Sequence, residues 1–264
     1  MKVALLQLPS IGMGSNKLDS YIKAAHSKDV KLIMLGEYIL NPFFKELVNT
    51  PINLIKEQSS FQLEYLKEQA KKYGITIVAP IVIVKKKELF KSIAKIAPTS
   101  TTYYNQQLLI NYPHWNEEKF FANPIEPLHE MMTFSLNGFK FGVMAGFESH
   151  FDELWSSVES KNLDCVIVPS ASTFDSHNRW RELLKMRAFT HNCYILRINR
   201  VGEYHDDSHA WKFYGDSMVL NPDGDIDLDL ANTEELMIIE LDKTHLNESR
   251  RDWGFRAAIK KRMP

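Results

Sequence analysis

The chain of 264 residues has few cysteines, almost no net charge and no long apolar run. Its two cysteines, Cys165 and Cys193, lie in separate apolar segments, which favours reduced core thiols over a disulfide or a catalytic thiol. A formal net charge of -1 gives no reason to expect a nucleic-acid partner. No apolar stretch approaches the roughly 20 residues of a membrane span, and the first apolar segment is too short for a signal peptide. We therefore expect a cytoplasmic protein.

Short apolar segments alternate with amphipathic ones along the chain. Continuous apolar runs are typical of strands buried on both faces, and they occur at 2–8, 32–35, 165–168 and 193–198. Helical periodicity predicts two helices, over 61–73 and over 178–191. Gly74 is expected to end the first of them. The lysine-rich turn at 85–87 and the pair Asn137-Gly138 predict two hairpins.

The absence of repeats and of any change in composition predicts one α/β domain over residues 1–264, with a mixed sheet covered by helices. Within it, residues 242–264 form a basic and polar C-terminal extension. Two interpretations of this extension are open: it docks on a partner subunit, or it is a partly ordered tail.

The segment 139–155 combines a strand, a tight turn and a helix. Residues 141–145 are apolar, Gly146 stands at the turn, and an amphipathic helix begins at Asp152. Many hydrolases hold a nucleophile at such an elbow, because the turn lifts one side chain off the sheet and its amides can receive negative charge. Glycine has no side chain, so this elbow lacks a nucleophile at that position.

A glutamate and a long loop are further candidates for function. Glu37 lies between Leu35 and the apolar residues 38–40. Burying an unpaired carboxylate costs several kcal/mol, so a buried Glu37 needs a partner or a raised pKa. A solvent-facing glutamate at a strand end fits the local sequence equally well. The loop over 111–127 is rich in aromatic residues and prolines, and loops of this length are commonly functional.

The elbow resembles the nucleophile motif of the carbon-nitrogen hydrolase (nitrilase) superfamily, Gly-x-x-x-Cys-Tyr-Asp-x-x-Phe-Pro-Glu. The first glycine, the Tyr, Asp, Phe and final Glu of the motif match Gly142, Phe147, Glu148, Phe151 and Glu153. Gly146 stands where the motif has Cys. Other segments are similar to the family in the same order, among them the Leu-Gly-Glu that ends at Glu37, Glu-Lys-Phe-Phe at 118–121, Val-Pro-Ser-Ala at 168–171 and Asn-Pro-Asp-Gly at 221–224.

The resemblance implies a four-layer αββα sandwich and a Glu-Lys-Cys catalytic triad that needs no cofactor or metal. In this family the Glu deprotonates the thiol, the Cys attacks an amide, carbamoyl or nitrile carbon, and the Lys stabilises the oxyanion. Residue by residue, the base is Glu37, Gln106 replaces the Lys and Gly146 replaces the Cys. A second glutamate of the family matches Glu118, with Glu117 as a near alternative.

Loss of a covalent nucleophile can lower kcat on the order of 10⁶-fold. One hypothesis is therefore a pseudoenzyme or much weakened amidase, nearest in pattern to N-carbamoylputrescine amidase and β-alanine synthase-like members. It keeps a pocket for a small polar or amine-bearing ligand, and the residues expected there are Glu37, Gln106, Glu118, Phe147, Glu148 and Ser170.

A second hypothesis is an active hydrolase of linear amides or carbamoyl-amines. Either Glu37 activates water in the space left at Gly146, or a serine, Ser149 or Ser170, acts as the nucleophile. A third hypothesis is a metal site of carboxylates and His150, but no typical ligand spacing supports it. The resemblance also implies a homodimer whose interface includes the helices near 152–161 and 178–191.

Overall fold

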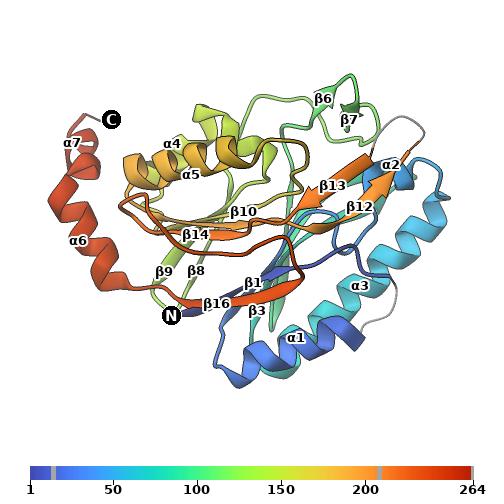
Figure 1. Cartoon of the computed structure of the whole chain (residues 1–264), viewed down its shortest axis with the longest axis horizontal. Helices are drawn as coiled ribbons and strands as arrows, with labels where there is room; N and C mark the ends of the chain where they lie inside the picture. The colour runs from blue at the N-terminus through green and yellow to red at the C-terminus, as the bar shows by residue number, and fades with distance from the viewer. Residues whose placement is uncertain (13–15, 207–209, 263–264) are drawn as a thin grey trace.

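Two six-stranded sheets face each other in the computed structural model, and helices cover their outer faces (Figure 1). The structure describes residues 1–12, 16–206 and 210–262. The first sheet contains, in spatial order, β16 (Glu235–Glu240), β1 (Lys2–Gln7), β2 (Leu32–Leu35), β3 (Thr76–Lys85), β4 (Glu88–Ala97) and β5 (Ser100–Asn105). The second contains β15 (Ile226–Asp229), β14 (Met218–Leu220), β11 (Tyr194–Ile198), β10 (Cys165–Pro169), β9 (Phe139–Val143) and β8 (Met132–Leu136). The predicted αββα sandwich is confirmed.

The apolar runs of the sequence are the central strands. Because successive side chains of a strand point to opposite faces, Val3 and Leu5 of β1 enter the core between the sheets, whereas Ala4 and Leu6 face the outer helices. Strand β10 divides its side chains in the same way, with Cys165 between the sheets and Val166 under helices. Both faces of these central strands are therefore buried, which explains why they lack polar alternation.

Amphipathic helices form the outer layers. Helices α1 (Asn16–Ser27) and α3 (Ile52–Tyr73) pack on the first sheet, and α4 (Asp152–Ser160) and α5 (His177–His191) pack on the second (Figure 1). Gly74 ends α3 in the left-handed conformation, with φ 64°, as the sequence predicts. No helix among residues 1–12, 16–206 and 210–262 has the length and apolar character needed to span a membrane.

The central strands of each sheet are parallel, and their carboxyl ends lie at the same edge of the two-sheet sandwich. Strands β1, β2 and β3 are parallel, as are β9, β10 and β11, and antiparallel strands flank each group. The carboxyl ends of parallel strands meet at one edge of a sheet, which is where open α/β sheets usually bind ligands. The backbone amide of Glu37, after β2, donates to the carbonyl of Ser170, after β10, at 3.1 Å. This bond joins the two sheets at that edge.

Several boundaries differ from the predictions. The helix predicted over 61–73 begins at Ile52 rather than at Phe61. The sequence analysis also missed the short helix α2 (Phe44–Leu47) and the small hairpins β6 (Asn111–Tyr112) with β7 (Trp115–Asn116) and β12 (Val201–His205) with β13 (Ala210–Tyr214). Most of their aromatic residues, among them Phe44, Trp115, Trp211 and Phe213, pack around Phe43 in a separate cluster. Aromatic packing across the chain, rather than local periodicity, defines these elements.

The C-terminal extension is helical and docks on its own chain. It forms α6 (Lys243–Trp253) and α7 (Phe255–Lys260), which lie at the end of the second sheet (Figure 1). Arg250 pairs with Asp164 at 2.8 Å, and the Arg256 guanidinium donates to the carbonyl of Leu163 at 2.7 Å. Leu246 is buried in the core between the sheets. The interpretation as a partly ordered tail is therefore wrong for the described residues 242–262.

Candidate active site

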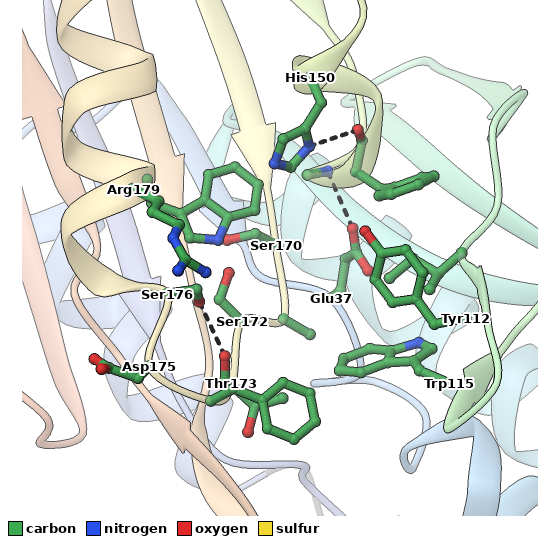
Figure 2. Close-up of a pocket in the computed structure, with 16 residues that line it drawn as sticks. Glu37, Tyr112, Trp115, His150, Ser170, Ser172, Thr173, Asp175, Ser176 and Arg179 are labelled. Carbon is green, nitrogen blue, oxygen red and sulfur yellow. Dashed lines mark hydrogen bonds between the residues drawn. The ribbon is translucent and has the colours of Figure 1, made fainter.

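A cavity of about 480 Å³ opens at the edge where the parallel strands end. This volume lies in the range typical of small-molecule sites. Its floor includes Glu37, Gly146 and Ser170, which follow β2, β9 and β10 respectively. Aromatic side chains form much of the wall: Tyr112, Trp115, Phe147, Phe174 and Trp180 (Figure 2). Further lining comes from the loop at 171–176, from the first turn of α5, and from Ile110 and His150.

Glu37 is buried at the cavity floor. One carboxylate oxygen, Oε1, accepts a hydrogen bond from the Gly146 amide at 3.2 Å (Figure 2), and Oε2 lies 2.7 Å from the Lys91 ammonium. Desolvation raises the pKa of Glu37 above its ordinary value, while Lys91 acts in the opposite direction. The solvent-facing alternative is therefore wrong: Glu37 is a buried, paired carboxyl group that reaches the cavity.

A buried lysine that the sequence analysis did not identify completes this group. Lys91 of β4 contacts Glu37 and both carboxylate oxygens of Glu117, at 2.8 and 2.9 Å. Burial alone would favour the neutral amine, but the charges of Glu117 and Glu37 raise the pKa of Lys91 overall. The Tyr38 hydroxyl also donates to Glu117. Two carboxylates and one ammonium thus form a closed cluster behind the cavity floor, with a formal charge of -1.

The backbone next to Glu37 has an unusual conformation. Tyr38 has φ 57°, in the left-handed region that bulky residues seldom adopt. Its carbonyl accepts hydrogen bonds from Ser10 Oγ at 2.5 Å and from the Arg200 guanidinium at 3.1 Å. The Tyr38 hydroxyl donates to Glu117, so hydrogen bonds fix both the backbone carbonyl and the side chain of Tyr38. Such strain persists where the surroundings enforce it, and it often marks functional sites.

Gly146 is packed directly against Ser170. A Cβ atom added at Gly146 would lie 2.7 Å from Ser170 Cβ, 3.1 Å from Ser170 Cα and 3.2 Å from the Pro169 carbonyl oxygen. Real Cβ atoms almost never approach other atoms to within 3.0 Å. Atoms at the end of β10 therefore occupy the space that the Cβ atom of a nucleophilic residue would need. The elbow itself is formed, because the 3₁₀ helix η1 (Phe147–His150) begins immediately after Gly146.

Two further predicted residues are buried outside the cavity lining. Glu148 accepts hydrogen bonds from the Tyr104 hydroxyl at 2.9 Å and from the amides of Gln107 and Ala145 at 2.6 and 2.7 Å. Desolvation raises the pKa of Glu148 to about 7. Gln106 directs its side-chain amide to the Leu108 carbonyl at 2.7 Å. Both residues therefore support the elbow and β5. Contrary to the expectation from the sequence, neither of them is part of the cavity lining.

The two adjacent glutamates at 117 and 118 lie in different environments. Glu117 is fully buried against Lys91 and Tyr38, whereas Glu118 is exposed, and neither residue is part of the cavity lining. Adjacent residues in an irregular loop can point in opposite directions. Glu117, which the sequence analysis gave as the near alternative, is therefore the one that contacts the buried cluster, and the assignment of the family's second glutamate stays a prediction.

In the described part of the chain, the other candidate nucleophiles donate to carbonyl and amide oxygens rather than to a base. Ser149 is buried and donates to the Gly146 carbonyl at 2.7 Å. Ser170 lines the cavity, but its hydroxyl lies 3.4 Å from its two acceptors, the Ile198 carbonyl and Asn199 Oδ1. Burial raises the pKa of the Cys193 thiol to about 12 and that of Cys165 well above its ordinary value. Both cysteines are buried core residues, as the sequence predicts.

The cavity rim carries charge of both signs. Arg179, on the first turn of α5, is exposed and faces the cavity from the side opposite Glu37 (Figure 2). Asp175 also belongs to the rim, but its carboxylate points away in the same view. His150 is exposed, with its ring 4.9 Å from that of Trp180. Across residues 1–12, 16–206 and 210–262, no three His, Cys, Asp or Glu side chains are grouped to hold a metal ion.

The comparisons with known proteins agree with this architecture. The family model for carbon-nitrogen hydrolases matches residues 2–251, and the chain belongs to this family. It is 26% identical to the omega-amidase of Saccharomyces cerevisiae, over 92% of this chain and 87% of that protein. It is 21% identical to N-carbamoylputrescine amidase of Arabidopsis thaliana, over 88% of this chain and 82% of that protein. A carbon-nitrogen hydrolase from Helicobacter pylori G27 has a similar structure, with a TM-score of 0.83 at 20% identity, covering 97% of this chain and 94% of that one.

Proposed function

We propose that this member of the carbon-nitrogen hydrolase family is a pseudoenzyme, or at most a much weakened amidase, that binds a small polar ligand. The observation that carries the proposal is the contact between Gly146 and Ser170, which leaves no room for a side chain at the elbow position. Meanwhile, the cavity and its buried carboxylate are intact. A thiol-dependent acyl transfer has no nucleophile here, but a binding site remains.

The charges around the cavity favour a ligand with a cationic or amide donor group at one end. The cluster of Glu37, Glu117 and Lys91 carries one net negative charge, and Glu37 presents Oε1 at the floor. Aromatic walls also attract cations. On the opposite side, Arg179 can pair with a carboxylate. We therefore propose an amine or amide whose other end is polar or acidic, a chemistry that fits the amide and carbamoyl-amine substrates named for the relatives.

Calorimetric titration tests this binding. The probes are putrescine, N-carbamoylputrescine and gamma-aminobutyrate, and we expect heat of binding from at least one of them. Replacing a charged hydrogen-bond partner costs about 1.5–3 kcal/mol, which corresponds to roughly a tenfold to hundredfold loss of affinity. Glu37→Gln should show such a loss with an amine, and Arg179→Gln with gamma-aminobutyrate.

Matched controls use charged residues outside the cavity. Glu118 and Arg251 are exposed and absent from the lining, so Glu118→Gln and Arg251→Gln should leave the affinity unchanged. An absence of heat for every probe would refute binding of this ligand class. An equal loss in Glu118→Gln would show that general surface charge, rather than Glu37, attracts the ligand.

The alternative function is hydrolysis by water that Glu37 activates. The raised pKa of Glu37 at a cavity floor favours it, because a general base works best when its pKa approaches the ambient pH. This route predicts ammonia release that Glu37→Gln abolishes. Turnover that persists in Glu37→Gln would exclude Glu37 as the base.

The assembly and location remain proposals. We propose a homodimer in the cytoplasm, with α4 and α5 at the interface, as the resemblance implies. Met186 on α5 is 55% exposed and supplies an apolar contact of the kind that interfaces bury.

A further inference from the structure

We propose that Lys91 on β4 has taken over the charge role of the lysine that Gln106 replaces on β5. The two residues are neighbours across one antiparallel ladder. Ser92 pairs with Asn105 in the register of β4 and β5, and the amide of Gln106 donates to the carbonyl of Lys91 at 3.0 Å. Lys91 and Gln106 therefore follow as the next opposed pair.

Opposed residues of an antiparallel pair direct their side chains to the same face, with Cβ atoms about 4.5–5.5 Å apart. A lysine has a stem of four carbons, so it can reach the same carboxylates from either position. Lys91 and Gln106 are 5% and 2% exposed, which shows that both side chains lie on an interior face. The buried lysine at this point of the ladder is thus Lys91 on β4, whereas the family pattern has its lysine at the position of Gln106, at the end of β5.

The contacts of Lys91 define what it does. Its ammonium group approaches Glu37 Oε2 at 2.7 Å and the two oxygens of Glu117 at 2.8 and 2.9 Å. Lys91 does not line the cavity. It is therefore a positioning residue: its positive charge favours the ionised form of Glu37, and its contact fixes Oε2, so that Oε1 remains at the cavity floor beside the Gly146 amide.

This inference concerns the charge of Glu37 and does not depend on the proposed ligand. The test transfers the lysine across the ladder in the full chain, comparing the wild type with Lys91→Gln and with the double variant Lys91→Gln, Gln106→Lys. Glutamate carboxyl carbons labelled with ¹³C report the pKa of Glu37 by NMR, and Glu37→Gln assigns the signal. An opposite charge within about 4–6 Å lowers a carboxyl pKa by about 1–3, so Lys91→Gln should raise that of Glu37 by this amount.

We expect the double variant to restore the Glu37 pKa to within about 0.5 of the wild-type value. This difference is small compared with the rise of about 1–3 expected for Lys91→Gln alone. Lys91→Gln combined with Gln106→Met carries no cation and should not restore it. A matched control moves another lysine across the same ladder, through Lys95→Gln with Thr102→Lys, which are also opposed residues. That control should leave the Glu37 pKa unchanged.

Two outcomes would overturn the inference. One is a Glu37 pKa in the double variant that matches Lys91→Gln alone. The other is a double variant that fails to fold while the Lys95 and Thr102 control folds normally, since a lysine at 106 would then be unable to replace Lys91. If only Lys91→Gln fails to fold, recovery of folding and of the Glu37 pKa in the double variant supports the inference.

Discussion

The contact between Gly146 and Ser170 gives a quantitative prediction about the elbow. Gly146 has φ −51° and ψ −50°, a conformation open to every L-residue, so Gly146→Ala introduces no backbone strain. Its cost arises from the new Cβ atom, 2.7 Å from Ser170 Cβ. Overpacking of this kind typically destabilises a protein by about 1–3 kcal/mol.

Gly12→Ala is a matched control. An added Cβ at Gly12 would meet no atom of residues 1–12, 16–206 and 210–262 within 4 Å, and Gly12 carries no positive φ. Both substitutions reduce the conformational entropy of the unfolded chain by the same amount. The difference between their free energies of unfolding therefore isolates the Ser170 contact, and we expect Gly146→Ala to be about 1–3 kcal/mol less stable than Gly12→Ala.

Ser170→Gly tests the partner of this contact. It removes the nearest atom, although Ser170 Cα and the Pro169 oxygen remain at 3.1 and 3.2 Å. Urea unfolding of the two single variants and the double variant should give a coupling energy of about 0.5–3 kcal/mol, with the double variant more stable than additivity predicts. Equal stability of Gly146→Ala and Gly12→Ala would refute the packing argument, as would a coupling energy of zero.

Two predictions concern pH and assembly. The pKa of Glu148 is about 7 in the folded protein, against an ordinary value of 4.5, so the native state binds its proton more tightly than the unfolded chain does. The free energy of unfolding should therefore fall as pH rises from about 4.5 to 7, and Glu148→Gln should flatten this fall when urea unfolding is measured across the window. The proposed dimer predicts twice the chain mass in light scattering, with Met186→Glu shifting the protein toward the monomer; a wild-type monomer at micromolar concentration would contradict it.

The sequence predicts most of the framework, because buried strands and amphipathic helices leave local patterns. The elbow at Gly146, the lysine-rich turn at 85–87 and the pair Asn137-Gly138 were all identifiable from such patterns. The structure confirms them, with Lys86 and Lys87 between β3 and β4. The C-terminal helices were missed because their apolar residues are few. They are held instead by arginines such as Arg250, which contact acidic and carbonyl groups far away in the sequence.

The site was only partly predictable. Glu37 was recognised because a carboxyl group among apolar residues is unusual, but Lys91 gave no such signal. In β4, Lys91 and Lys95 both fit an alternating strand with one exposed face, and only the fold places Glu37 and Glu117 around the first of them. The sequence could not distinguish Glu117 from Glu118 for a similar reason, since loop geometry decides which neighbour faces inward. One signal was available in the sequence. Lys91 stands on the strand that pairs with that of Gln106, where the family has its lysine.

The proposed function requires that the cavity binds a polar small molecule without hydrolysing it. The most direct test measures ammonia release from the same N-carbamoylputrescine samples in which calorimetry records binding. We expect heat that Glu37→Gln diminishes, together with ammonia at the level of a protein-free control. Ammonia release by the wild type that Glu37→Gln abolishes would contradict this proposal and identify an enzyme in which water activated by Glu37, rather than a thiol, attacks the substrate.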